Sequence, residues 1–239
     1  MRILITNDDG IEAEGIRVLT TWATALGEVT VVAPKFEQSA KSQSIVLRKP
    51  FEVRKIDVFS DLKVTAYSVD STPADCVRLA VDKFGEFDLV FSGVNRGLNI
   101  GYDISYSGTC AAVFEANYAK IPAVAFSTVP NDFIHAEKAL DTVWEYFEKN
   151  KLLSLCDIYN VNIPEEPRGI MITRQGGAYF RDHFTECEKD MFVTSTFIAS
   201  KKGDNDDIHY DTEAVFSGYI SIMPMTVDHT NTEALKKLI

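Results

Sequence analysis

The stretch 2-RILITNDDG-10 decides the fold prediction. Its first five residues form a short apolar run that stops at the polar cluster Asn7-Asp8-Asp9-Gly10. An apolar run of this length, closed by turn-forming residues, is typical of a buried strand that leads into a loop. Residues 15–26 then carry apolar side chains at helical spacing. We therefore expect the fold to begin with a strand, a polar loop and a helix.

The alternation of strands and helices continues along the chain. Strands are expected at residues 29–33, 51–56, 63–69, 88–91, 123–126 and 158–163, and helices at residues 72–83, 107–120 and 133–147. Strands that alternate with helices are the signature of βαβ units on a parallel sheet whose two faces are both covered. The sequence thus predicts an α/β fold, namely a Rossmann-like, doubly wound and mostly parallel sheet.

The character of the sequence changes around Pro164 and Pro167. Extended segments are expected at residues 169–174, 191–199 and 215–223, where few apolar residues have the spacing of an amphipathic helix. Residues 201–207 are expected to form an exposed turn. We divide the chain into an α/β core at residues 1–167 and a β-rich C-terminal hairpin appendage at residues 168–239. The apolar side chains of this appendage would form a large exposed patch on a monomer, so we expect it to mediate oligomerisation.

The composition is that of a globular protein with an acidic surface. The 239 residues are 46% hydrophobic and 25% charged, with a formal net charge of −11. Such a charge repels nucleic-acid polymers and anionic membranes, and no apolar run reaches the roughly 18–20 residues of a membrane span. The N-terminus lacks a secretory h-region, and the four cysteines show no CxxC spacing. We expect a cytoplasmic protein with reduced cysteines and neither nucleic-acid nor membrane partners.

Polar side chains follow three predicted strands at their carboxyl ends. Asp8 and Asp9 follow the first strand, Ser39 follows the second, and Asn95 follows the strand at residues 88–91. Ligands of open parallel sheets bind outside these strand ends, so the side chains should converge. Adjacent carboxylates repel each other unless a cation lies between them. Carboxylate, hydroxyl and amide oxygens suit Mg²⁺ or Mn²⁺ better than Zn²⁺, and the pattern predicts such a metal site.

An anion-binding element is expected beside the metal. Ser107-Gly108-Thr109 opens a predicted helix, whose N–H groups and hydroxyls attract an anion. Arg96 can add a bidentate phosphate contact. Each element also has a purely structural interpretation, such as a turn, a helix cap or a surface arginine. Their coincidence at strand ends favours metal-assisted phosphate chemistry.

Other functional classes lack their motifs. The chain has no GxxxxGK[ST], no GxGxxG at its first strand–helix turn and no GxSxG. A receiver-like regulatory domain also carries an acidic pair after its first strand. It needs a further acceptor aspartate and a lysine at later strand ends, whereas the corresponding strand here ends in SGVN at residues 92–95.

A series of short motifs runs along the chain in a fixed order. It comprises ITNDDGI at residues 5–11, EQS at 37–39, SGVNRGLNIG at 92–101, YSGT at 106–109 and GYISIMP at 218–224. This order resembles that of the SurE (survival protein E) family of nucleotidases over essentially the whole chain. The resemblance implies a metal-dependent phosphomonoesterase that hydrolyses nucleoside 5′-monophosphates, with 3′-nucleotidase and polyphosphatase side activities. A catalytically silent metal- and nucleotide-binding regulatory protein stays as the alternative.

The resemblance also implies roles for single residues. The family's metal ligands correspond to Asp8, Asp9, Ser39 and Asn95, which would hold one Mg²⁺ or Mn²⁺ per subunit. The resemblance makes Asp8, Asp9 and Asn95 catalytic; Asp8 would orient or deprotonate water or attack the phosphorus itself, which the sequence leaves open.

Substrate binding and assembly follow from the same resemblance. Arg96, Ser107, Gly108 and Thr109 would contact the nucleotide. Family members exchange a C-terminal arm between subunits, which implies a homodimer or a tetramer. Departures from the family pattern, such as Ala40, border the site and leave the substrate preference open.

Overall fold

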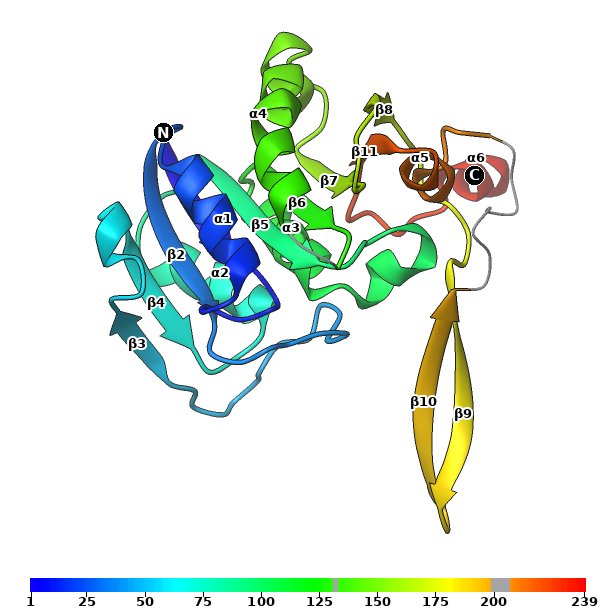
Figure 1. Cartoon of the computed structure of the whole chain (residues 1–239), viewed down its shortest axis with the longest axis horizontal. Helices are drawn as coiled ribbons and strands as arrows, with labels where there is room; N and C mark the ends of the chain where they lie inside the picture. Colours follow the sequence, from blue (N-terminus) through cyan, green and yellow to red (C-terminus); the bar gives the residue numbers. More distant parts are fainter. Residues whose placement is uncertain (131–132, 199–206) are drawn as a thin grey trace.

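Figure 1 shows the computed structural model of the chain, which describes residues 1–130, 133–198 and 207–239. The strands are β1 (Arg2–Thr6), β2 (Glu28–Pro34), β3 (Val53–Ile56), β4 (Thr65–Val69), β5 (Leu89–Arg96), β6 (Ala123–Thr128), β7 (Ile158–Ile163), β8 (Gly169–Ile172), β9 (Phe180–Glu188), β10 (Met191–Ile198) and β11 (Tyr219–Pro224). The helices are α1 (Glu14–Ala23), α2 (Pro73–Lys83), α3 (Gly108–Tyr118), α4 (Ile134–Lys149), α5 (Asp211–Phe216) and α6 (Thr232–Leu238), with 3₁₀ helices η1 (Ser60–Leu62), η2 (Gly101–Tyr106) and η3 (Leu152–Ser154). The turn expected at residues 201–207 lies outside the described residues except for its last residue, and so does residue 199 of the expected strand at 191–199.

Within the described residues, one nine-stranded sheet has the order β3-β4-β2-β1-β5-β6-β7-β11-β8. The six strands from β4 to β7 in this order run parallel to one another. β3 pairs antiparallel with β4, and β11 pairs antiparallel with β7. The prediction of a doubly wound, mostly parallel sheet is confirmed.

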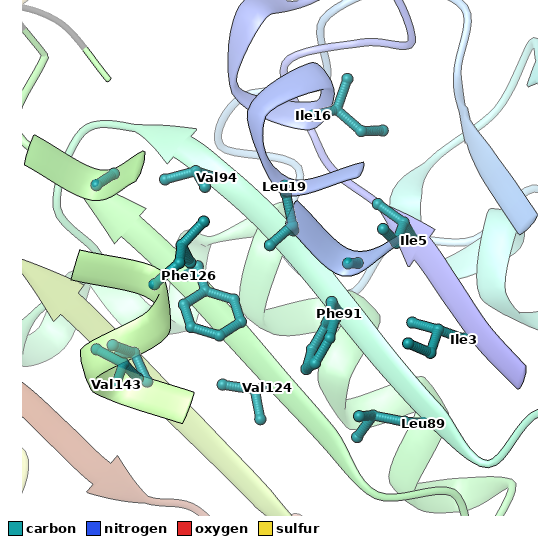
Figure 2. Packing of buried hydrophobic residues seen from close by; sticks show 14 of the residues in the cluster. Ile3, Ile5, Ile16, Leu19, Leu89, Phe91, Val94, Val124, Phe126 and Val143 are labelled. Carbon is teal, nitrogen blue, oxygen red and sulfur yellow. The ribbon is translucent and has the colours of Figure 1, made fainter. Parts of the chain in front are cut away.

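Helices cover both faces of the sheet because the strands are apolar on both sides. Ile3 and Ile5 of β1 pack under α1 and α4, whereas Leu4 between them packs in the cluster that contains α2 and α3. In Figure 2, Phe91 of β5 and Phe126 of β6 lie side by side beneath α1 and α4, with ring centroids 5.6 Å apart. A strand buried on both faces needs such a continuous apolar run.

The N-terminus of α2 is capped by the side chain of Thr72. Thr72 adopts extended backbone angles, and its hydroxyl oxygen accepts the backbone N–H of Asp75 at 3.2 Å. Pro73 occupies the first helical position, where its missing N–H costs nothing. The same hydroxyl donates to the carbonyl of Ser44 at 2.7 Å, so the cap also holds the loop after β2.

Replacing Thr72 by alanine should lower the free energy of unfolding by about 1 kcal/mol, because the Asp75 N–H loses its acceptor. Urea unfolding measures the change. Thr21→Ala is the control, since it removes an exposed hydroxyl that donates within α1 to the Arg17 carbonyl. Equal losses in the two variants would contradict the capping role.

Two parts of the chain differ from the expectation. β5 continues to Arg96 instead of ending at residue 91, with an irregular register against β6 between Ser92 and Asn95. Asn95 therefore lies in the strand and not in a loop. Residues 211–216 form α5, and residues 232–238 form α6, where no helix was expected. Both helices are too short for an amphipathic stripe to show in the sequence.

The C-terminal region contributes both to the main sheet and to a separate hairpin. β8 and β11 extend the main sheet beyond Pro167, and α5 packs against β11. The hairpin β9–β10 projects away from the sheet, as Figure 1 shows in yellow. The division expected at residue 167 thus crosses a continuous sheet. None of the described helices is long and apolar enough to cross a membrane.

Candidate active site

The carboxyl ends of β1, β2 and β5 meet at one cavity of about 640 Å³. β1 lies between β2 and β5, so the chain reverses its direction of winding at β1, where ligands bind in open α/β sheets. Five of the predicted site residues line this cavity: Asp8, Ser39, Asn95, Arg96 and Ser107. The other three, Asp9, Gly108 and Thr109, contact these lining residues from behind.

Asp8 is held in place by the N-terminus of α3. Its side chain is almost fully buried, and Oδ1 accepts the hydroxyl of Thr109 at 2.6 Å. A Cβ atom at Gly108 would lie 2.8 Å from Asp8 Cβ and 2.9 Å from Oδ2, so only glycine permits this approach. Burial raises the pKa of Asp8 to about 6. The hydrogen bond from Thr109 acts in the opposite direction and lowers the pKa, whereas the charge of Asp9 raises it further.

Asp9 lies on the β5 side of the same turn. Its Oδ2 accepts the backbone N–H of Arg96 at 3.1 Å. Burial raises the pKa of Asp9, the Arg96 N–H and charge lower it, and the nearby Glu37 carboxylate raises it. The site therefore holds two partly desolvated carboxylates side by side, an arrangement that a cation stabilises.

The guanidinium of Arg96 has hydrogen-bond partners other than the aspartates. Its guanidinium donates to Glu14 Oε2 and to the Pro130 carbonyl, each at 3.2 Å, and lies 4.8 Å from the centroid of the Phe133 ring. The guanidinium is thus engaged beside α1 and the start of α4. A contact between Arg96 and a phosphoryl group stays a prediction, while its backbone N–H already supports Asp9.

Ser39 and Asn95 provide the neutral oxygens of the site. The backbone N–H of Gln38 donates to the Asp8 carbonyl at 2.7 Å, which fixes the loop of Ser39 against β1. Ser39 donates its hydroxyl to Glu37 Oε1 at 2.6 Å. The amide nitrogen of Asn95 donates to the Gly97 carbonyl at 2.8 Å, so this hydrogen bond does not use the amide oxygen.

The donor set fits a hard divalent cation. It consists of two carboxylates, a hydroxyl and an amide oxygen, which are Mg²⁺ or Mn²⁺ ligands. Among the described residues, no three His, Cys, Asp or Glu side chains are grouped so as to hold a metal ion.

Ser107 directly precedes α3 as its N-cap and lines the cavity. Its hydroxyl oxygen accepts the backbone N–H of Cys110 at 3.1 Å, so the side chain is a helix cap. The side chain also lines the cavity, where the helix N-terminus attracts an anion. Thr109 instead directs both its hydroxyl and its N–H to Asp8.

A group of aromatic side chains in the cavity wall was not expected from the sequence. Tyr102 and Tyr106 of η2 line the cavity, and 61% and 60% of their surfaces are exposed. Phe180, the first residue of β9, lines it as well. Large aromatic side chains in a polar loop were the available signal, because such residues are otherwise buried.

The hairpin completes the wall of the cavity. Asp182 of β9 and Thr196 of β10 line it and are joined by a 2.6 Å hydrogen bond from the threonine hydroxyl. Asp103 of η2 lies nearby, and its pKa is raised by burial and by the charge of Asp182. Asp182 is far from Asp8 in the sequence, so only the tertiary structure could assign it to the site.

Comparisons with known proteins identify the family that the chain resembles. The family model described as Survival protein SurE matches residues 3–182. The chain is 38% identical to a 5′-nucleotidase SurE of Clostridium botulinum, over 99% of this chain and 97% of the relative. It is also 38% identical to 5′-nucleotidase SurE 1 of Thermus thermophilus, over 100% of this chain and 98% of the relative.

A solved structure gives the same result for the fold. The crystal structure of the SurE protein from Aquifex aeolicus superposes with a TM-score of 0.81 at 33% sequence identity. The match covers 100% of this chain and 98% of that chain. The likeness therefore includes the C-terminal strands and helices as well as the α/β core.

Proposed function

The chain belongs to the SurE family, and on that premise we propose that it is a metal-dependent 5′-nucleotidase. It would hydrolyse nucleoside 5′-monophosphates to nucleosides and inorganic phosphate. The observation that carries the proposal is a single cavity that holds the buried Asp8 together with the exposed rings of Tyr102 and Tyr106. One part of such a cavity suits a metal-bound phosphate, and the other suits a nucleoside.

The metal would be held by Asp8, Asp9, Ser39 and Asn95, as one Mg²⁺ or Mn²⁺ per subunit. When bound, such a cation polarises a phosphoryl oxygen and lowers the pKa of a coordinated water.

Asp8 is the residue best placed to act on the attacking water. Thr109 fixes Oδ1, so the carboxylate has one orientation, and Oδ2 is the oxygen beside the α3 N-terminus. In our proposal Oδ2 orients the water or accepts its proton while the water oxygen bonds to phosphorus. The bond from phosphorus to the nucleoside oxygen breaks, and that oxygen takes up a proton. Direct attack by Asp8 is the alternative route.

The N-terminus of α3 would bind the phosphoryl oxygens. Ser107 lines the cavity at this helix end, and Gly108 keeps the helix close to Asp8. Arg96 would add its positive charge once it releases Glu14. These hydrogen-bond donors would then stabilise the negative charge that develops on the phosphoryl group.

The nucleoside would bind against the aromatic wall. Stacking of a base on an aromatic ring contributes about 1–3 kcal/mol and tolerates different bases, because every base has a π-face. Tyr102, Tyr106 and Phe180 offer such rings. We therefore propose a broad base specificity, with side activities on 3′-nucleotides and short polyphosphates in the same cavity.

A phosphate-release assay tests the proposed function. AMP, GMP, CMP and UMP are each incubated with the full chain in Mn²⁺, in Mg²⁺ and in EDTA. We expect release with all four nucleotides in the presence of a cation and none in EDTA. Release that EDTA leaves unchanged would contradict the metal dependence. A chain that binds nucleotide without any release would favour the catalytically silent alternative.

Mn²⁺ at ten times its dissociation constant should raise Tm by roughly 3–6 °C. Binding only to the folded state contributes about 1.4 kcal/mol at this concentration, and each kcal/mol shifts Tm by about 2–4 °C for a chain of this size. Asp9→Asn should lose the shift because it removes one carboxylate ligand. Calorimetry measures both, and the same shift in the Asp9→Asn variant would contradict the proposed ligand set.

We propose that the chain assembles into a homodimer or a tetramer through its C-terminal region. The hairpin β9–β10 exposes more than half of the surface of four large apolar side chains: Phe184, Met191, Phe192 and Val193. A projecting two-stranded hairpin cannot cover these residues itself. Exposed apolar patches of this kind mark protein interfaces.

The double variant Phe184→Asp, Phe192→Asp should sediment as a smaller species than the parent at micromolar concentration. The two charges would be buried in the proposed interface without partners. Leu155→Asp is the matched control, since Leu155 is 76% exposed but lies after η3, away from the hairpin. A parent chain that sediments as a monomer would contradict the proposal.

We also propose that the protein is cytoplasmic. Cys76, Cys110, Cys156 and Cys187 are all free thiols in the structure, which suits a reducing compartment. The net charge of −11 disfavours nucleic-acid polymers and membrane surfaces as partners. The nucleotide itself would be drawn in by the bound cation and the helix N-terminus.

A further inference from the structure

Asp211 is a buried carboxylate that does not line the cavity. It is fully buried at the first position of α5. Its oxygens accept three backbone N–H groups: Oδ1 from Gly176 and from Thr212, both at 2.7 Å, and Oδ2 from Gly101 at 2.9 Å. One carboxylate therefore joins three chain segments, two of which are 110 residues apart in sequence.

The three segments around Asp211 form a closely packed corner. A Cβ atom at Gly101, where φ is +56°, would lie 2.0 Å from the Gly177 carbonyl oxygen. A Cβ atom at Gly176 would lie 2.3 Å from the Thr212 hydroxyl oxygen. Gln175 adds a hydrogen bond from its amide to the Gly101 carbonyl at 2.8 Å. Without Asp211, the three N–H groups would be buried without an acceptor, which is costly.

The tethered segments carry the aromatic wall of the cavity. Gly101 is the first residue of η2, which bears Tyr102 and Tyr106. Gly176 lies four residues before Phe180, which lines the cavity from the start of β9. Small displacements of either segment would move these rings relative to Asp8, which follows β1 and is held by Thr109 of α3.

We infer that Asp211 is a positioning residue that fixes the nucleoside-binding wall of the cavity relative to its metal-binding end. This inference rests on the proposed nucleotidase function. Asp211 then determines how well the nucleoside is bound, whereas the metal site and the chemistry at phosphorus are set by β1, β5 and α3. Loss of its hydrogen bonds should therefore raise KM for nucleotides more than it lowers kcat.

Asp211→Asn tests the assignment with the full chain. Asparagine keeps the size of the side chain but replaces one acceptor oxygen by an NH₂ donor, which cannot accept an N–H. We expect KM for AMP to rise at least tenfold, while kcat and the Mn²⁺ concentration for half-maximal activity change less than threefold. An unchanged KM, or a fall in kcat with KM unchanged, would overturn the assignment, because a purely structural role lowers the active fraction without changing KM.

Asp75→Asn is the matched control. Asp75 is also buried and accepts a backbone N–H, from Val46 at 2.8 Å, together with the Ser71 hydroxyl at 2.6 Å, but it does not line the cavity. It should leave KM for AMP within twofold of the parent value. An equal rise in KM in this variant would overturn the assignment to Asp211.

A milder variant decides the case if Asp211→Asn does not fold. Gln175→Ala removes only the side-chain bond to the Gly101 carbonyl and should raise KM for AMP about threefold with kcat unchanged. An unchanged KM would overturn the assignment. A parent chain that releases no phosphate from AMP in Mn²⁺ would instead contradict the proposed function, independently of either variant.

Discussion

Asp8→Asn should lower kcat/KM for nucleoside monophosphates by at least about 10³-fold, the scale observed when a catalytic carboxylate is removed. Asp8 is the one residue that would both bind the metal and act on the attacking water. Asparagine keeps the volume and an acceptor for Thr109, but it removes the negative charge and the basic oxygen. Phosphate release and Mn²⁺ binding by calorimetry should both be impaired.

The fold should survive this substitution. Burial raises the pKa of Asp8 to about 6, so its ionised form costs folding free energy at neutral pH when no metal is bound. The neutral asparagine removes that cost. In EDTA at pH 7.5 we therefore expect the variant to have a Tm equal to or higher than that of the parent.

Asp61→Asn is the matched control for Asp8→Asn. Asp61 is an exposed carboxylate in η1 that forms an ion pair with Arg17. Exposed pairs of this kind contribute about 0–1 kcal/mol to stability. Its activity should stay within twofold of the parent. If Asp8→Asn kept more than a tenth of the parent activity, Asp8 could not be the central residue of the site.

Gly108→Ala should lower kcat/KM by about 10²-fold, an effect comparable to that of removing one fixed donor from an active site. The added methyl group would lie 2.8 Å from Asp8 Cβ and 2.9 Å from its Oδ2, so either α3 or Asp8 must shift. A shift separates Asp8 from Thr109 and moves the anion-binding helix end away from the metal. The change should appear in kcat as well as in KM.

Gly169→Ala serves as the control for this prediction. A Cβ atom at Gly169, in the edge strand β8, would meet only the Tyr219 ring, at an ordinary distance of 3.7 Å. Its activity should match that of the parent. Full activity in Gly108→Ala would show that α3 can retreat without loss, which would contradict the close packing of the helix end as a requirement.

The core strands could be predicted because each carries its own signal. The run from Arg2 to Thr6 is apolar on both sides, and the structure buries Ile3 and Leu4 on opposite faces of the sheet. A strand of that kind requires helices on both faces, so the doubly wound architecture follows from local sequence. A threonine followed by a proline is a typical helix start, and α2 begins at Pro73 with Thr72 as its cap.

The helices of the C-terminal region could not be predicted in the same way, although the extended segment expected at residues 169–174 corresponds to β8. α5 has six residues, too few for a helical periodicity to be distinct. Both are stabilised by partners far away in the sequence, β8 by β11 and α5 by contacts that include Asp211. Their structure depends on tertiary contacts and not on local preference.

For the site, the sequence by itself determined which residues lie at the carboxyl ends of β1, β2 and β5, because strand direction places those ends at one edge of a parallel sheet. Asp8, Ser39 and Asn95 were found in this way, and they line one cavity. Only the tertiary structure decided how each side chain is used. The guanidinium of Arg96 donates to Glu14, and the hydroxyl of Thr109 donates to Asp8. The aromatic wall, and the carboxylate that fixes it, join segments up to 110 residues apart, and such contacts are set by packing, which has no local signature in the chain.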